Sequence, residues 1–205
     1  MQGFEVIIAI AIVIMSVVIH EVSHGYAAYM LGDKTAAYEG RLTLNPFKHL
    51  DFVGSVLVPL LTYASGGFIL GWAKPVPFNP YNLRSARWGE AIVAAAGPLS
   101  NICLAVLFSI VLRLGIITER LSPSFIELAS LVVLINLGLA FFNLVPIPPL
   151  DGSKIIFSFF PARFTAIREG MERSSLILLL IFVFFFSRIL LPLVVGAFTL
   201  LTGIT

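Results

Sequence analysis

The chain alternates long apolar stretches with short polar segments rich in turn-forming residues. The apolar stretches occupy residues 4–31, 52–72, 90–115, 124–149 and 174–204. About 20 helical residues cross a membrane hydrocarbon core of about 30 Å, because an α-helix rises about 1.5 Å per residue. Each stretch is long enough to cross. The pattern therefore predicts an all-α polytopic membrane protein, a helical bundle of about five to six membrane segments.

Three segments depart from the pattern of a straight helical span. Residues 52–72 contain Pro59 and a glycine pair, which favour a re-entrant segment. Residues 174–204 are interrupted by an arginine and a proline, which fits either a kinked span or a short hairpin. Residues 40–44, after the first helix, alternate weakly in polarity and predict a short strand or loop.

Composition agrees with the membrane class and excludes several others. Of the 205 residues, 59% are hydrophobic and 12% are charged, about half the share of a soluble domain, and the mean hydropathy is +1.01. The net charge of +2 is too balanced for a nucleic-acid partner. The polar loops are too short to fold alone, so we expect one integral-membrane domain over residues 1–205, with the lipid bilayer as its solvent.

Two further features bear on how the chain is processed. The first apolar stretch lacks a basic leader and a cleavage site, so we expect a retained span rather than a signal peptide. The single cysteine, Cys103, lies in an apolar run and excludes an intramolecular disulfide.

The candidate chemistry begins with His20, Glu21 and His24, which spell HExxH inside the first apolar stretch. Four residues advance a helix by about 400°, so both imidazoles lie on one face and can reach one metal ion. The alternative is a pair of structural histidines hydrogen-bonded within a bundle. Ionisable side chains in an apolar span are costly and mark functional sites, so the motif favours a zinc centre.

A catalytic zinc needs a third protein ligand. The candidates are His49, Asp33, Asp51 and Asp151. Asp151 is favoured because it ends the run VPIPPLDG, whose prolines forbid regular helix. Irregular backbone at membrane depth occurs where it lines a cavity or is buried in protein. The alternative is that Asp151 caps a helix or forms a turn.

Five motifs occur together in this order: HEVSH at 20–24, GRLTLNPFKHLD at 40–51, GWAKPVPFNP at 71–80, AGPLSN at 96–101 and NLVPIPPLDG at 143–152. With them the chain resembles the site-2 proteases, a family of intramembrane zinc metalloproteases. It is similar to the small form of that family, which has neither a PDZ nor a CBS domain. The motifs cover most of residues 15–155, within a catalytic core of about 4–155.

The resemblance implies roles for individual residues. His20, His24 and Asp151 would bind one zinc ion, and Glu21 would be the general acid and base. Asn143 would assist at the substrate or at the developing oxyanion. For Asn143 an interhelical hydrogen bond is an equal alternative, since Asn136 lies seven residues earlier on the same face. Asn101, which ends the motif AGPLSN, has the same two alternatives, and for it a structural role is favoured.

The resemblance also implies the activity. The protein would be a zinc-dependent endopeptidase that cuts in or near transmembrane segments of other membrane proteins, such as membrane-anchored signalling precursors. Two alternatives stay open, a metal-ion transporter and a catalytically silent interaction homologue. Replacement of Glu21 alone separates the three.

Topology gives an independent expectation. HEVSH lies near the C-terminal end of the first helix, and Asp151 follows the end of the fourth, so the two helices must run parallel to share a metal. Residues 52–72 then enter and leave on one side, which collects ten basic residues and leaves two on the other. The bias of basic loops predicts a cell-membrane protein whose active site lies toward the cytoplasm.

Overall fold

The computed structural model describes residues 2–51, 74–85 and 88–204, and within these ranges all regular structure is helical. Three helices are long and apolar enough to cross a membrane: α1 (Gln2–Met30), α4 (Gly89–Ile117) and α5 (Pro123–Asn143). The helical membrane class is therefore confirmed. The segment 52–72, expected to be re-entrant, lies outside the described residues.

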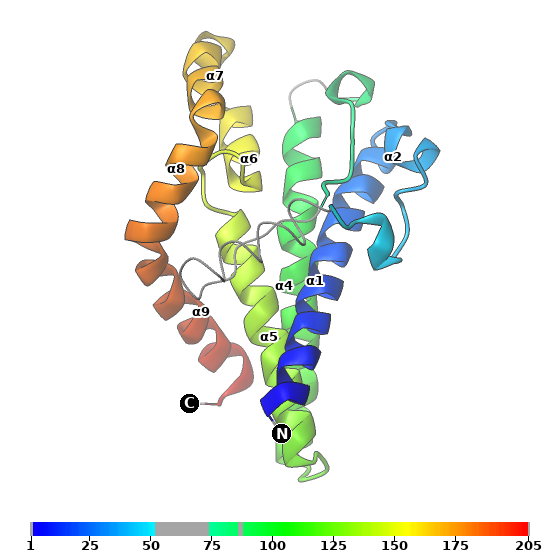
Figure 1. The fold of residues 1–205 in the computed structure, drawn as a ribbon, viewed down its shortest axis with the longest axis vertical. Coiled ribbons are helices and arrows are strands. Elements are labelled where there is room, and N and C mark those ends of the chain that lie inside the picture. Colours follow the sequence, from blue (N-terminus) through cyan, green and yellow to red (C-terminus); the bar gives the residue numbers. More distant parts are fainter. Residues whose placement is uncertain (1, 52–73, 86–87, 205) are drawn as a thin grey trace.

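The three long helices form the core of the bundle (Figure 1). Helix α4 packs against α1 and α5 and runs opposite to both, so α1 and α5 run parallel. This is the arrangement that a site shared between the end of α1 and the residues after α5 requires. Small side chains line these contacts, such as Ala105 and Ala129, and allow close helix packing.

Local sequence determines where α5 begins and ends. The Ser122 hydroxyl accepts the backbone N–H of Phe125, and Pro123 occupies the first helical position. The helix ends at Asn143 because prolines follow it, and residues 144–150 form an irregular link. Helix α6 (Asp151–Phe159) starts directly after this link, so Asp151 lies in its first turn.

The segment between α1 and α4 holds only short elements in its described part: α2 (Thr35–Tyr38), η1 (Pro46–Lys48) and η3 (Pro80–Asn82). The strand considered at residues 40–44 is wrong, and the region is a loop. Gly40 has a φ of +62°, and the N–H of Arg41 bonds to the Ala36 carbonyl. The segment therefore closes a turn on α2, and its geometry at this point is not that of extended backbone.

The C-terminal part contains η4 (Ala162–Phe164), α7 (Thr165–Arg173), α8 (Ser175–Ile181), the π-helix η5 (Phe182–Phe186) and α9 (Ser187–Thr202). Helices α8 and α9 follow one another through η5, and the axes of residues 175–185 and 188–202 differ by 66°. Counted as one broken span, this pair gives a fourth candidate membrane crossing. Helix α9 packs on α5 and α4, where Val194 and Phe198 join the apolar core.

Two contacts connect the C-terminal helices to the start of α4. The Arg168 guanidinium on α7 makes two hydrogen bonds to the Glu90 carboxylate, with distances of 2.7 and 3.0 Å. This pairing, against the opposing effect of burial, holds the pKa of Arg168 above its usual value. Trp88 meets Phe159 of α6 edge to face, with ring centroids 5.0 Å apart. These contacts connect the N-terminal end of α4 to α6 and α7.

Candidate metal centre

Three potential metal ligands converge where α1 and α6 meet. The Nε2 atoms of His20 and His24 lie 3.1 Å apart, and Oδ2 of Asp151 lies 3.1 and 3.2 Å from them. All three residues are buried, and among the described residues they form a group that could hold a metal ion. The structure thus brings together the two motif histidines and the aspartate that the sequence favours.

Helix α4 forms the wall behind the two imidazoles. A Cβ atom on Gly97 would lie 2.5 Å from ring atoms of His24 and 2.6 Å from Cε1 of His20. Real Cβ atoms essentially never approach other heavy atoms so closely. Only glycine at this position leaves room for both rings.

The far ring nitrogen of each histidine meets an oxygen atom on α4. Nδ1 of His24 lies 2.7 Å from the backbone carbonyl oxygen of Val93, and Nδ1 of His20 lies 2.6 Å from Oδ1 of Asn101. A carbonyl oxygen only accepts, so Nδ1 of His24 donates, and in the neutral ring Nε2 carries a lone pair. That lone pair points toward the shared centre.

The donor set fits a zinc ion. The Nε2 lone pair of His24 faces a carboxylate oxygen of Asp151 at 3.2 Å, an arrangement of two acceptors that a cation between them stabilises. Ligands at about 2.0–2.1 Å from a tetrahedral zinc lie about 3.3–3.4 Å apart, close to the observed separations. The three atoms also leave one side of such a tetrahedron for water or substrate.

The group opens into a cavity of about 150 Å³, and Glu21 lines it beside the two histidines. Glu21 Oε2 accepts the backbone N–H of Val76 at 2.9 Å. Val76 belongs to residues 74–83, a segment without regular structure up to Asn79 that ends in η3, and we call it the strap because it contacts the C-terminal half of α1. The strap therefore holds the Glu21 carboxylate at the cavity.

The strap is itself anchored by buried side chains. Arg41 Nη2 donates to the carbonyl oxygen of Lys74 at 2.9 Å. The Asp33 carboxylate accepts from Asn79 N at 2.7 Å and from Asn82 Nδ2 at 2.9 Å, in addition to two bonds from Thr35. Burial alone would raise the pKa of Asp33, but these hydrogen bonds outweigh burial and hold the pKa below its usual value.

The other candidate ligands have different positions. The Asp33 carboxylate accepts hydrogen bonds from the strap. Nε2 of His49 donates to the Thr43 carbonyl at 2.8 Å. Asp51 is also outside the convergent group. Asn143 does line the cavity, and its Nδ2 donates to the Leu139 carbonyl of its own helix at 3.0 Å.

Sequence analysis missed several cavity residues. Lys154 lines the cavity, and its position three residues after Asp151 places it on the same face of α6, a signal that spacing could have provided. Val76 contributes only a backbone N–H, which no side-chain motif reveals.

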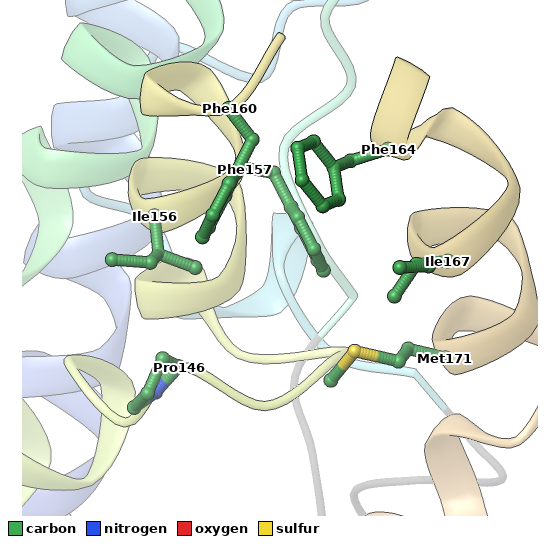
Figure 2. Close-up of a pocket in the computed structure, with 7 residues that line it drawn as sticks. All are labelled: Pro146, Ile156, Phe157, Phe160, Phe164, Ile167 and Met171. Carbon is green, nitrogen blue, oxygen red and sulfur yellow. The ribbon is translucent and has the colours of Figure 1, made fainter. Parts of the chain in front are cut away.

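A larger cavity of about 340 Å³ lies on the other side of α6 (Figure 2). Its lining is apolar: Pro146, Ile156, Phe157, Phe160, Phe164, Ile167 and Met171. None of these described lining side chains could move a proton or is a His, Cys, Asp or Glu that would bind a metal. The chemistry therefore belongs to the smaller cavity.

Comparison with known proteins agrees with this site. The family model described as Peptidase family M50 matches residues 114–187. A Bacillus subtilis protein named "Putative zinc metalloprotease YwhC" is 39% identical over 173 residues, which are 82% of this chain and 76% of that protein. The chain belongs to peptidase family M50, the site-2 protease family.

More distant relatives carry the name "Putative zinc metalloprotease Rip2". The protein from Mycolicibacterium smegmatis is 33% identical over 158 residues, 71% of this chain and 54% of the relative. The Mycobacterium tuberculosis protein is 31% identical over 139 residues, 68% of this chain and 52% of the relative. The chain thus spans about half the length of the Rip2 proteins. No solved structure matches.

Membership in M50 confirms the predicted class, a membrane-embedded zinc metallopeptidase, and zinc as the cofactor. It does not by itself assign individual ligands. Those assignments rest on the convergence of His20, His24 and Asp151.

Proposed function

We propose that this protein is a zinc-dependent intramembrane endopeptidase whose single domain, residues 1–205, hydrolyses peptide bonds in or near transmembrane segments of other membrane proteins. His20, His24 and Asp151 bind the zinc ion. The observation that carries the proposal is the convergence of these three ligand atoms beside Glu21, in a cavity built on helices able to cross a membrane.

When bound, zinc supplies Lewis-acid polarisation of the scissile carbonyl and lowers the pKa of a coordinated water toward 7. Glu21 accepts the proton of the attacking water and then delivers it to the leaving amine. The bond from Val76 N–H to Oε2 orients this carboxylate at the cavity. Positioned acid–base groups of this kind typically contribute about 10²–10⁴-fold to the rate.

Asn143 lies at the same cavity and stabilises the oxyanion through its amide group. One N–H of its Nδ2 already bonds to Leu139, which orients the amide and leaves the second N–H for the substrate. A helical substrate hides its peptide bonds in its own hydrogen bonds. The scissile segment must therefore unwind before its carbonyl reaches this cavity.

The test is the Glu21→Gln variant, compared with wild type after purification in detergent and reconstitution with a single-span model peptide containing mid-span glycines. Glutamine keeps the size of the side chain and removes the basic carboxylate. We expect about one zinc ion per chain in both proteins and at least about 100-fold slower cleavage by the variant. Equal cleavage rates would overturn the proposal. Zinc transport into vesicles by both proteins, with cleavage absent in both, would identify a transporter.

We further propose that the site lies toward the cytoplasmic face of a cell membrane, on the side that collects most basic residues. Single cysteines at Tyr38 and Glu119, in a Cys103→Ser background, test this. Both positions are exposed, and they lie at opposite ends of the long helices. A membrane-impermeant maleimide added outside intact cells should label Glu119→Cys and spare Tyr38→Cys. The reverse pattern would place the site on the outer face.

A further inference from the structure

A chain of buried polar side chains runs from His20 away from the metal centre. Asn101 Nδ2 donates to Asn136 Oδ1 at 2.8 Å, and Asn136 Nδ2 donates to Ser16 Oγ at 3.0 Å. Asn101 and Asn136 are completely buried, and Ser16 is nearly so. These three hydrogen-bonded side chains connect α1, α4 and α5, where neighbouring apolar side chains offer no hydrogen-bond partners.

Two backbone carbonyls determine the direction of every bond in this chain. Asn136 Nδ2 lies 2.9 Å from the Val132 carbonyl oxygen, so the amide nitrogen must face Val132 and the amide oxygen must face Asn101. Asn101 Nδ2 likewise faces the Ser16 carbonyl oxygen at 3.4 Å as well as Asn136 Oδ1. The only amide atom that Asn101 can present to His20 is therefore its oxygen.

We propose that Asn101 is a positioning residue that holds His20 in the Nδ1–H tautomer, so that Nε2 is the atom offered to the metal. The bond that does this is the 2.6 Å contact between His20 Nδ1 and Asn101 Oδ1. Asn136 acts one step further out by fixing the orientation of the Asn101 amide. The inference rests on the proposed function, in which His20 is a zinc ligand.

The second histidine shows the same design with a backbone partner. His24 Nδ1 donates to the Val93 carbonyl, which lies two helical turns before Asn101 on α4. Helix α4 thus presents one acceptor to each imidazole. For His24 the acceptor is a backbone carbonyl, which the helix holds in place. For His20 the acceptor is the side chain of Asn101, whose orientation depends on its hydrogen bonds to Asn136 and to the Ser16 carbonyl. Such outer partners typically change metal affinity by about 10–100-fold when removed.

The first experiment measures the coordinating nitrogen directly. The chain has three histidines, so protein labelled with ¹⁵N-histidine and loaded with ¹¹³Cd gives a simple spectrum. We expect two histidines coupled to cadmium through Nε2, each with a protonated Nδ1, and the third, His49, uncoupled. Coupling of His20 through Nδ1 would overturn the inference alone. Absence of coupling on every histidine would overturn the metal site itself and, with it, the inference.

The second experiment compares zinc dissociation constants of three variants. Asn101→Leu removes the acceptor at similar volume and should weaken binding by about 10–100-fold. Asn101→Asp keeps an oxygen for His20 Nδ1 but loses the donor to Asn136, and it should stay within about threefold of wild type. Ser109→Ala, which removes a buried hydroxyl on the same face of α4 without touching a histidine, should leave affinity unchanged.

The pattern across the variants separates positioning from packing. If Asn101 only joined the helices, Asn101→Asp would lose as much affinity as Asn101→Leu, because both break the bond to Asn136. Equal losses in the two variants, or wild-type affinity in Asn101→Leu, would overturn the inference. Should Asn101→Leu fail to fold, the cadmium coupling in wild type and the Asn101→Asp affinity still decide it.

Discussion

Gly97 shows how much the site depends on a single missing atom. It lies on α4 directly behind His20 and His24, where the two rings fill the space that a side chain would need. The ligands come from α1 and α6, yet a third helix sets the position of two of them. At this scale the site depends on close helix contact as well as on ligand identity.

Gly97→Ala should therefore damage the centre although it changes no ligand. The new methyl group would overlap the rings at about 2.5 Å, and overpacking of this kind typically costs about 1–3 kcal/mol. We expect at least about a tenfold loss of zinc affinity, measured by competition with a chromophoric chelator. The matched control is Gly138→Ala on α5, where a Cβ meets nothing within 4 Å and zinc affinity should not change. Wild-type affinity in Gly97→Ala would mean that α4 can move away from the rings.

At the scale of elements, the strap completes the cavity with residues that precede η3 and belong to no helix. It carries three prolines and obtains its order from outside, through Asp33, Arg41 and Glu21. Outside η3 the strap has no regular structure, so side chains from other segments supply hydrogen bonds to its backbone.

Asp33→Asn should loosen the strap and do so in a pH-dependent way. Because the folded pKa of Asp33 lies below its unfolded value of about 3.8, its stabilisation is complete above that pH and is lost as the pH falls further. Loss of charged hydrogen bonds of this kind costs about 1.5–3 kcal/mol. We expect a lower unfolding temperature for the variant at pH 7, followed by circular dichroism in detergent, and convergence with wild type as the pH falls below 3.8 and through the lowered folded pKa of Asp33.

The control for this variant is Glu39→Gln, an exposed carboxyl on the same loop. It should unfold like wild type throughout this pH range. A difference between Asp33→Asn and wild type that did not shrink as the pH was lowered below 3.8 would show that ionisation of Asp33 does not stabilise the strap.

At the scale of the whole molecule, the proposed centre joins the first membrane helix to a helix more than 120 residues later. Metal binding that requires this meeting stabilises the folded state, by about 2.7 kcal/mol at a hundredfold excess over the dissociation constant. Apart from the buried polar side chains of Ser16, Asn101 and Asn136, the long helices pack through apolar contacts and small residues. The centre is thus expected to act as a cross-link as well as a catalytic group.

Zinc removal should accordingly lower the stability of the entire domain. For a chain of this size, a loss of about 2.7 kcal/mol corresponds to a fall of roughly 5–11 °C in the unfolding temperature. We expect this shift when wild type is treated with a chelator, and we expect re-addition of zinc to reverse it. His24→Ala should show no zinc-dependent shift, whereas His49→Asn should keep it. A zinc-dependent shift in His24→Ala would place the stabilising ion elsewhere.

The helical membrane class followed from hydropathy alone, because the membrane requires long apolar segments that satisfy their own backbone hydrogen bonds. The turn around residues 40–44 did not, since weak alternation does not distinguish a strand from a loop held by distant side chains. The helix predicted in the fourth apolar stretch is confirmed as α5, and the prolines after it correctly indicated irregular backbone before Asp151.

What the sequence by itself determined is local: helices set by hydropathy, and two histidines and a glutamate set on one helix by their spacing. It also favoured Asp151, because prolines placed that carboxylate outside regular helix. Only the tertiary structure decided the contacts among distant segments, such as Asn101 on His20, 81 positions away, and Val76 on Glu21, 55 positions away. The physical reason is that spacing along a helix follows from backbone geometry, whereas the approach of one helix to another depends on packing over the whole bundle.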